Sequence, residues 1–341
     1  MDADGSLKSV PVLGGSRFFY QAYLFGLFPV LSHMKTDMPK RIKLILNPIS
    51  NHDRATQVAA SLYHLTEGLD AQWCTSESPR HAVELAHAAG AEGYDLVVAA
   101  GGDGTVHEVI HGLMQIPAGT RPALGIVPLG SGNDFAHILG VPEDPAEALH
   151  SCLEGKVQLL DIGSVQDENG RLEYFNNTIG IGFDAVVTIH ARKIKMIHGF
   201  MMYLVATLQT ILRNFKPMDL QVETDNESWS QSTIMLTLGN GPREGGGFMV
   251  TPEARLDDGL LNYVTIRKIS RLTMLRLVPQ VMKGTHGSFP QVRFGVCRKM
   301  RITSQQPLYV HCDGEIFAGF EHDLRQLEIE ILPGALKYLK A

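Results

Sequence analysis

The sequence has 341 residues, which is long enough for two domains that each bury a core of their own. Hydrophobic residues make up 44% of it and charged residues 19%, proportions that exclude a largely disordered chain. The 30 Lys and Arg residues are outnumbered by 36 Asp and Glu residues, and the net charge of -6 gives no support to nucleic-acid binding. Four scattered cysteines, Cys74, Cys152, Cys297 and Cys312, have no paired spacing, which indicates reduced thiols in a cytoplasmic protein.

Residues 1–38 form an N-terminal extension ahead of the first predicted strand. Within it, residues 17–34 are rich in aromatic residues and leucine, but Gln21, Gly26 and Pro29 interrupt the run. The run is shorter than the ~20 apolar residues of a membrane-spanning helix, and it lacks the features of a secretory signal. Three interpretations stay open: an interfacial membrane anchor, an extension added for expression, and a start codon placed too early, with the natural start at Met34 or Met38. The last two together are favoured over the anchor.

Residues 39–159 alternate between strand and helix patterns. Apolar runs at residues 41–48, 71–76, 94–102 and 123–132 predict buried strands, and residues 53–69, 79–90, 105–114 and 133–140 predict helices. The strands are apolar throughout rather than at every second residue, which favours a parallel sheet with helices on both faces. The sequence therefore predicts an α/β domain built on an open parallel sheet.

Residues 160–341 have a different pattern. Short strand-like segments, mostly separated by turn residues, predict a largely antiparallel β-sandwich; they include residues 174–187, 219–225, 232–240, 260–269, 299–304, 308–314 and 327–332. Two helical segments, 193–215 and 270–286, interrupt the strands. Polar residues dilute the first of these, so a packed helix is favoured over a membrane span. We expect the C-terminal tail to return to the first domain.

Residues 101–111, GGDGTVHEVIH, contain two overlapping motifs. His107, Glu108 and His111 match the H-E-x-x-H pattern of zinc hydrolases, in which two histidines bind the metal and the glutamate acts as base. However, the third histidine of the metzincins does not follow, and no downstream carboxylate stands out as a ligand. His107 also lies in the first turn after a glycine-rich loop. The zinc interpretation is therefore disfavoured, and two polar residues beside an apolar helix stripe are the simpler explanation.

Glycine-rich turns follow two neighbouring strands of the predicted sheet. Residues 101–105 (GGDGT) lead from a strand into a helix, whose free backbone N–H groups and positive dipole end attract phosphate. Residues 128–134 (PLGSGND) repeat this arrangement, and residues 47–51 (NPISN) end the first strand at the same edge of the sheet. Ligands bind outside the carboxyl ends of the strands in open parallel sheets. The sequence therefore predicts a phosphate-binding edge.

These motifs occur in a fixed order together with GGGFMVTPEARLDDGLL (245–261) and CDGE (312–315). In combination they resemble the diacylglycerol kinase catalytic-domain family, most closely its bacterial soluble lipid kinases, which are kin to sphingosine and ceramide kinases. The resemblance extends from about Lys40 to the C-terminus. It implies a transferase that uses ATP and Mg²⁺ in phospholipid metabolism, in the cytoplasm and in peripheral contact with membranes. The family has Asn more often than His at positions 107 and 111, so the H-E-x-x-H pattern is a coincidence of two substitutions.

The resemblance implies ATP contacts at the strand ends. They are Asn47, Pro48, Ile49, Ser50, Asn51, Thr75, Gly101, Gly102, Asp103, Gly104, Thr105, Val106, His107 and Ser131. These positions offer mainly backbone N–H groups and short hydroxyls, which suit phosphate and ribose. The family usually has Gly where this sequence has Asn51, and Asn is the residue that best replaces Gly in a left-handed conformation.

Four carboxylates are candidates for catalysis. Asp103 and Asp134 are candidate ligands of the catalytic Mg²⁺, directly or through water, because this ion prefers oxygen ligands; helix capping is their alternative role. The resemblance makes Glu315 the general base that takes the proton of the lipid hydroxyl, with Asp313 assisting near the metal. An ordinary Asp-Gly hairpin turn is the alternative for that segment.

A second, structural Mg²⁺ site is implied by the resemblance in residues 255–260. It would use the carboxylate of Asp258 and the carbonyl groups of Arg255 and Leu260. A metal-free Asp-Gly turn is the alternative.

The resemblance also implies that the active site lies in the cleft between the two domains and that the acceptor is a lipid alcohol at a membrane surface, diacylglycerol or a related lipid; the sequence does not distinguish among these lipids. Phe248, Met249, Met201 and Met202 are candidates for the wall of a lipid pocket, although such residues are more often plain core. An NAD kinase and a non-catalytic nucleotide- or lipid-binding protein remain as alternatives. The sequence also leaves open whether the protein is a homodimer.

Overall fold

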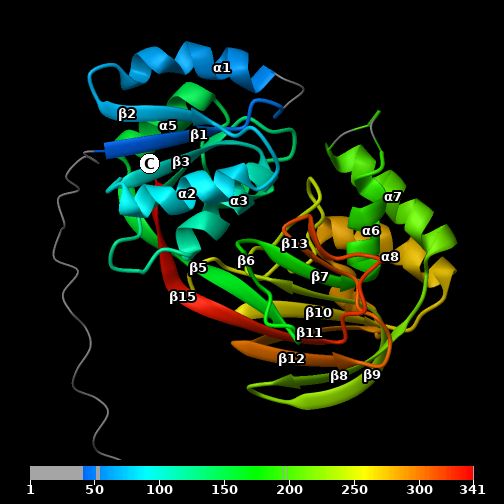
Figure 1. The fold of residues 1–341 in the computed structure, drawn as a ribbon. Coiled ribbons are helices and arrows are strands. Elements are labelled where there is room, and N and C mark those ends of the chain that lie inside the picture. The colour runs from blue at the N-terminus through cyan, green and yellow to red at the C-terminus, as the bar shows by residue number, and fades with distance from the viewer. Residues whose placement is uncertain (1–40, 51–53, 195, 198, 341) are drawn as a thin grey trace, which may run out of the picture. The chain divides into compact units, whose positions relative to one another are not determined.

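The computed structural model describes residues 41–50, 54–194, 196–197 and 199–340 (Figure 1). The N-terminal extension and Asn51, one of the predicted ATP contacts, lie outside the described residues. We call residues 41–154 the α/β half and residues 156–340 the β-rich half.

The α/β half contains four parallel strands in the order β4-β3-β1-β2, so their carboxyl ends lie along one edge of the sheet. Buried side chains of α2, α3 and α4 pack on one face, and those of α1 and α5 pack on the other. The elements are β1 (Arg41–Leu46), α1 (Arg54–Leu62), a 3₁₀ turn (Tyr63–Thr66), β2 (Asp70–Thr75), α2 (His81–Ala91), β3 (Leu96–Gly101), α3 (Asp103–Met114), β4 (Ala123–Pro128), α4 (Asp134–Leu139) and α5 (Pro145–Glu154). In β3, Val97 and Ala99 face one helical layer while Val98 and Ala100 face the other. Both faces are covered, which explains why the strand is apolar throughout.

Helix α5 is absent from the sequence-based prediction. The side chain of Asp144 accepts hydrogen bonds from the N–H groups of Ala146 and Glu147, and Pro145 occupies the first helical position. Both are ordinary signals of a helix start, so the sequence contained the information to predict α5.

In the β-rich half, every pairing between its own strands is antiparallel. One buried cluster fills the interior of the sandwich, and a second lies between the sheet and helices α6, α7 and α8. The elements are β5 (Lys156–Asp167), β6 (Leu172–Phe175), β7 (Thr178–Gly182), α6 (Phe183–Ala191), α7 (Gly199–Arg213), β8 (Met218–Thr224), β9 (Ser228–Gly239), β10 (Leu261–Arg267), α8 (Arg271–Lys283), a 3₁₀ turn (His286–Ser288), β11 (Val292–Cys297), β12 (Lys299–Ser304), β13 (Val310–Cys312), β14 (Glu315–Ala318) and β15 (Gln326–Lys340). The predicted fold class, an α/β domain followed by an antiparallel sandwich, is confirmed.

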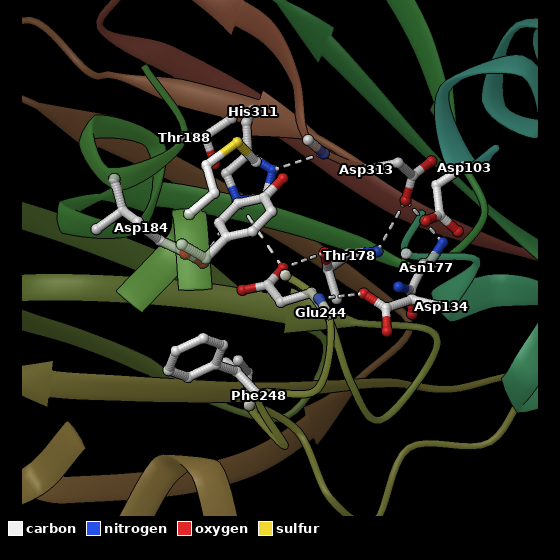
Figure 2. A pocket seen from close by; sticks show the side chains of 18 of the residues that line it. Asp103, Asp134, Asn177, Thr178, Asp184, Thr188, Glu244, Phe248, His311 and Asp313 are labelled. Carbon is white, nitrogen blue, oxygen red and sulfur yellow. Dashed lines mark hydrogen bonds and ion pairs between the residues drawn. The ribbon is translucent and has the colours of Figure 1, made fainter. Parts of the chain in front are cut away.

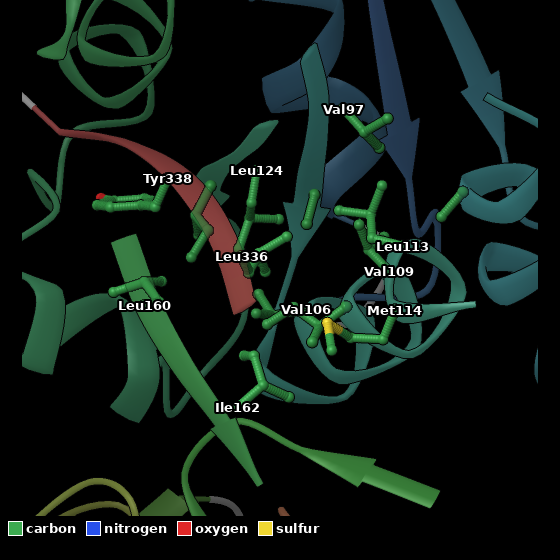
Figure 3. Close-up of a cluster of buried hydrophobic side chains, with 14 of the residues drawn as sticks. Val97, Val106, Val109, Leu113, Met114, Leu124, Leu160, Ile162, Leu336 and Tyr338 are labelled. Atoms are coloured by element: carbon green, nitrogen blue, oxygen red, sulfur yellow. The ribbon is translucent and has the colours of Figure 1, made fainter. Parts of the chain in front are cut away.

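The last strand, β15, joins the two halves. It pairs with β5 and β12 in antiparallel fashion, and its end pairs with β4 in parallel, Tyr338 opposite Leu124. As a result, side chains of β5 and β15, including Leu160 and Leu336, enter the same buried cluster as Val106 of α3 (Figure 3). The junction between the halves is therefore packed core rather than a flexible linker.

The prediction of a strand over residues 174–187 is wrong in its second part. Gly182, with φ +82, ends β7, and the chain continues as helix α6. Seven of the nine residues of α6 are buried, so the helix has no polar stripe to reveal its period. Within the predicted helical segment 193–215, the structure places α7 at Gly199–Arg213. Among the described residues, no helix combines the length and the apolar character needed to cross a membrane.

Candidate active site

Two glycine-rich turns touch at the carboxyl edge of the parallel sheet. Gly102 lies between β3 and α3, and Gly130 lies between β4 and α4. A Cβ atom on Gly130 would lie 2.4 Å from the Cα atom of Gly102, which is closer than side chains can approach. Glycine is therefore required here, and it brings the N-terminal turns of two helices side by side.

Asn47, at the end of β1, is tied to the same edge. Its Nδ2 donates to Oγ1 of Thr105 at 3.1 Å, and its Oδ1 accepts the N–H of Ile49 at 3.2 Å. Ser50 lines the adjacent cavity, and Thr75 ends the neighbouring strand β2. The structure thus brings the described members of the predicted ATP set close to one edge of the sheet.

Asp103 and Asp134 begin α3 and α4 and lie close enough to repel each other. Oδ1 of Asp103 accepts the N–H of Phe135 at 3.1 Å. Burial raises the pKa of Asp103 to about 6, and the charge of Asp134 adds to the shift. Asp134, in contrast, has a positive partner from the β-rich half: Nε of Arg243 donates to its Oδ1 at 2.9 Å, and the Gly246 N–H donates to its Oδ2 at 2.7 Å. A bound cation would therefore stabilise the negative charge of Asp103 more than that of Asp134.

A cavity of about 360 Å³ opens beside these turns (Figure 2). One end is polar and is lined by both glycine turns. The rest extends between the sheet of the β-rich half and helices α6, α7 and α8, where apolar residues predominate, among them Val187, Met202, Phe248, Ile266, Met274 and Val278. Of the predicted pocket residues, Met202 and Phe248 line this cavity, whereas Met249 does not and Met201 is exposed on α7.

Glu315 faces the first turn of α3. Its Oε1 lies 3.4 Å from the position that a Cβ atom on Gly104 would take, and Gly104 directly follows Asp103. Its Oε2 forms an ion pair with Arg192, the residue after α6. The carboxylate of Glu315 therefore lies beside the glycine turn that precedes α3, with Oε1 toward that turn and Oε2 toward Arg192.

Asp313 is saturated by hydrogen bonds. Its Oδ1 accepts the N–H groups of Asn177 and Thr178 at 2.8 and 2.9 Å, and its Oδ2 accepts that of Asn176 at 2.9 Å. Nδ1 of His107 lies 2.9 Å from the same Oδ2. These four contacts occupy the acceptor capacity of both oxygens, so the geometry fits a residue that positions the loop before Glu315 rather than a metal ligand.

His107 points toward the β-rich half and not into the glycine turn. Its Nε2 lies 3.5 Å from Oε1 of Glu173, which also contacts Nδ1 of His111 at 2.6 Å. Burial opposes a charge on His107, but hydrogen bonding to Asp313 and Glu173 outweighs it and raises the pKa of His107 to about 10. The same contacts outweigh the effect of burial on Glu173 and lower its pKa. His107 is therefore a buried cation between two carboxylates.

This arrangement bears on two expectations for His107. As a predicted ATP contact, it has only its backbone available, because its side chain is buried between the halves. As a zinc ligand, it lacks partners: in the described part of the chain, neither His107 nor His111 belongs to a group of side chains spaced to hold a metal.

Asp184, Glu244 and His311 form a second buried group of charges, at the inner wall of the cavity (Figure 2). Nε2 of His311 lies 3.4 Å from Oδ2 of Asp184 and 3.9 Å from Oε2 of Glu244. Burial and the charge of Asp184 raise the pKa of Glu244 to about 8. Thr178 donates to Glu244, and Thr237 donates to Asp184 at 2.7 Å.

The state of His311 decides what this group can hold. The Gly314 N–H donates to its Nδ1 at 3.2 Å, which an imidazolium could not accept. The ring is therefore neutral and carries its hydrogen on Nε2, the nitrogen that faces Asp184. The three side chains have the spacing of a metal site, but a hydrogen on Nε2 blocks coordination there.

The loop predicted to hold a structural Mg²⁺ is anchored by a different carboxylate. Asp161 is buried, and its Oδ2 and Oδ1 accept the N–H groups of Gly259 and Gly334 at 2.6 and 2.7 Å. Asp258 is exposed, and its Oδ1 accepts the N–H of Leu260 at 3.0 Å. The carboxylate of Asp258 is thus accessible to an ion, while Asp161 holds the loop in shape.

Sequence reasoning missed six residues of this site: Glu173, Asp184, Arg192, Arg243, Glu244 and His311. None of them lies in a glycine turn or another recognisable motif. Only the absence of a local partner for the predicted carboxylates hinted that basic residues must come from elsewhere in the chain.

Comparison with known proteins places this arrangement in a family. The family described as the diacylglycerol kinase catalytic domain matches residues 41–165, and the one described as the YegS C-terminal NAD kinase beta sandwich-like domain matches residues 177–340. The chain belongs to the diacylglycerol kinase catalytic-domain family. The resemblance drawn from the motifs is confirmed.

Individual relatives agree with this assignment. A protein named diacylglycerol kinase from Mycobacterium tuberculosis (strain CDC 1551 / Oshkosh) is 31% identical over 307 residues, which cover 88% of this chain and 95% of that protein. A protein named "Probable lipid kinase YegS-like" from Chromohalobacter salexigens is 35% identical over 257 residues, covering 74% of this chain and 78% of that protein. The crystal structure of a diacylglycerol kinase from Bacillus anthracis str. Sterne has the same fold, with a TM-score of 0.69 at 23% identity over 89% of this chain and 98% of that one.

Proposed function

We propose that this protein is an ATP-dependent lipid kinase that phosphorylates the hydroxyl group of a lipid alcohol, diacylglycerol or a related lipid. The observation that carries the proposal is the continuity of one cavity. Its polar end lies at the glycine turns that suit phosphate, and its apolar interior lies among α6, α7 and α8. A phosphate donor and an apolar acceptor with a hydroxyl group would meet inside it. The names of the relatives support a lipid acceptor.

The α/β half would hold ATP. The turns at Gly101–Thr105 and around Ser131 offer backbone N–H groups to the phosphates, and Asn47, Ser50 and Thr75 lie along the same edge. Because these groups are fixed by strand ends and helix starts, they orient the phosphates without reorganisation.

Glu315 would act as the general base. The acceptor oxygen attacks the γ-phosphorus, the bond from that phosphorus to the bridging oxygen of ADP breaks, and the hydroxyl proton passes to Glu315. Oε1 is the suitable atom, because it faces the first turn of α3 while Arg192 holds Oε2. Asp313 contributes by fixing the loop that carries Glu315.

Mg²⁺ bound with ATP supplies the neutralisation of charge on the transferring phosphates. Asp103 fits this ion well: it is half-buried, it has a raised pKa, and it lies beside a second carboxylate. Asp134 fits less directly, since Arg243 and Gly246 already occupy its oxygens. We assign Asp103 as the protein ligand and Asp134 to a contact through water.

Phosphate transfer from radiolabelled ATP tests the proposal. The purified full chain is incubated with Mg²⁺, labelled ATP and a panel of lipid alcohols, with NAD as a separate acceptor. We expect label in the lipid fraction and a loss of about 10²- to 10⁴-fold in kcat for Glu315→Gln, with ATP binding retained. Glu321→Gln is the matched control, because Glu321 is exposed, lies near Glu315 in the sequence and pairs with His322 in the described structure.

Two results would contradict the proposal and point to the alternatives. Label in NADP instead of lipid would indicate an NAD kinase. Lipid and ATP binding without phosphate transfer, equal in the native chain and Glu315→Gln, would indicate a non-catalytic binding protein.

A further inference from the structure

Two stretches of the β-rich half contain no acidic residue, although the chain as a whole is acidic. Residues 185–218 and 259–312 have no Asp or Glu, and they contain the whole of α7 and α8. Exposed basic residues lie on and beside these helices: Arg213, Lys216, Arg271, Arg276 and Lys283. In the described structure, Arg213, Arg271 and Arg276 form no ion pair, so their charge is available to a partner.

The same helices expose large apolar side chains. Met201, Leu208 and Leu212 follow one another at helical spacing along α7 and are 52, 41 and 68% exposed. Leu272 and Leu275 of α8 are 60 and 41% exposed and share a face with Arg276. The two helices pack against each other, on the side of the sandwich that also carries α6 (Figure 1).

The opposite faces of these helices line the cavity. Met202 and Tyr203 of α7, together with Met274 and Val278 of α8, face its interior. The helix pair is therefore a wall with a cavity on its inner side and a cationic, apolar surface on its outer side. A lipid acceptor in a bilayer at this outer surface would be separated from the cavity only by the helix pair.

We propose that the outer face of α7 and α8 docks on the surface of a lipid bilayer that contains anionic lipids. The role of this surface, the delivery of a lipid acceptor, rests on the proposed function. The binding itself depends only on the charged and apolar side chains of the two helices. Apolar side chains enter the boundary between headgroups and acyl chains, while basic residues around them attract anionic headgroups. A bilayer explains both features at once: the charge is of one sign, and the apolar residues form stripes beside it.

Vesicle flotation of the full chain tests the docking surface. The probes are vesicles of phosphatidylcholine alone and of phosphatidylcholine mixed with phosphatidylglycerol. We expect binding to the mixed vesicles only, and a loss of binding as NaCl rises from about 0.1 M to about 0.5 M, because salt screens the basic residues. Leu208→Asp combined with Leu212→Asp should weaken binding by about tenfold or more. Arg271→Gln combined with Arg276→Gln should weaken it by about fivefold for each charge removed.

Leu172→Asp is the matched control, because Leu172 is 44% exposed but lies on β6, away from both helices. Its binding should equal that of the native chain. The arginine variant keeps the test valid if the leucine variant does not fold. Equal binding by the native chain and both variants would overturn the proposal and indicate another contact, such as the N-terminal extension. Absence of binding to mixed vesicles would overturn it too. The proposal would also be overturned if the native chain were a dimer in solution and the leucine variant a monomer, since a second copy of the chain would then cover the surface.

Kinase activity separates this inference from the proposed function. With a short-chain, water-soluble lipid alcohol, the docking variants should match the native chain, whereas with the same alcohol in mixed vesicles they should lose activity in proportion to binding. If neither the native chain nor any variant phosphorylates a lipid alcohol, the proposed function is wrong. The flotation result still shows whether α7 and α8 bind the bilayer.

Discussion

The two halves of the molecule face the same cavity with different chemistry. The α/β half presents backbone groups and glycines, and its carboxylate Asp103 is crowded by Asp134 and forms no ion pair with a basic side chain among the described residues. Two carboxylates of the β-rich half, in contrast, are already compensated, although Glu244, whose pKa is raised by burial and by the charge of Asp184, is not. Asp313 is saturated by four donors, and Glu315 is paired with Arg192.

This difference has a physical consequence. A charge that is already compensated stabilises the fold, and removing it leaves its partners buried and unpaired. A charge that is left uncompensated costs stability and is available to a ligand. Substitution of Asp313 should therefore damage folding first, whereas substitution of Asp103 should damage function while improving folding.

Asp313→Ala should have the largest effect. It removes the acceptor of three backbone N–H groups and leaves His107 as a buried cation with one carboxylate partner instead of two. We expect a loss of about 3–5 kcal/mol in the free energy of unfolding, measured by urea denaturation. Asp323→Ala is the control, because Asp323 is exposed and pairs only with the exposed Arg325. A loss of less than about 1 kcal/mol for Asp313→Ala would show that the hydrogen bonds to Asp313 contribute little to stability.

His107→Gln should cost less and should change the pH dependence. The pKa of His107 is raised from 6.5 to about 10 on folding, so its contribution is complete below pH 6.5 and is lost as the pH rises toward 10. We expect a loss of about 2–3 kcal/mol at pH 7 and a much smaller difference between native chain and variant near pH 10. His150→Gln, at an exposed ion pair with Glu154, should show no such dependence. A difference that stays constant from pH 7 to pH 10 would contradict a charged His107.

The two halves also differ in how far their site residues could be predicted from the sequence. Each polar group of the α/β half follows a strand end, so a glycine turn, Asp103 and Asp134 could be placed at one edge from periodicity and turn residues alone. The family resemblance added Glu315, whose motif by itself indicates only a hairpin.

The partners of these carboxylates could not be read in this way. Arg243 meets Asp134 across 109 positions of sequence, and Glu173 contacts His107 only because β6 packs beside α3. Contacts of this kind depend on how the two halves pack, and no local pattern encodes that packing. The buried helix α6 was missed for a related reason: burial on all sides hides the polar face that would have revealed its period.

Asp103→Asn should stabilise the protein. Folding raises the pKa of Asp103 from 3.8 to about 6, so the native chain loses stability as the pH rises from about 4 to about 6. A neutral Asn escapes this loss. Because Asp103 is half-buried and water screens part of the repulsion, we expect a gain of about 1 kcal/mol at pH 7. Phosphate transfer should fall by about 100-fold in the same variant. A variant that is both less stable and fully active would contradict the division of roles between the two halves.

Asp258→Asn should have the smallest effect, and only when Mg²⁺ is present. The exposed carboxylate of Asp258 is the one charged ligand proposed for the structural ion, while Asp161 shapes the loop without any metal. We expect Mg²⁺ to raise the Tm of the native chain by about 2 °C, roughly 1 kcal/mol of binding energy in a chain of this size, and to raise that of the variant less. Asp257→Asn is the control, because Asp257 precedes Asp258 in the chain and is also exposed, but pairs with Arg255. Asp103 is the ligand proposed for the other Mg²⁺, the one bound with ATP. In the Asp103→Asn variant, Mg²⁺ should therefore still raise the Tm by the part that binding at Asp258 contributes. If Asp103→Asn abolishes the whole shift and Asp258→Asn none of it, the loop is a metal-free turn and the uncompensated carboxylate of the α/β half is the one that binds the ion.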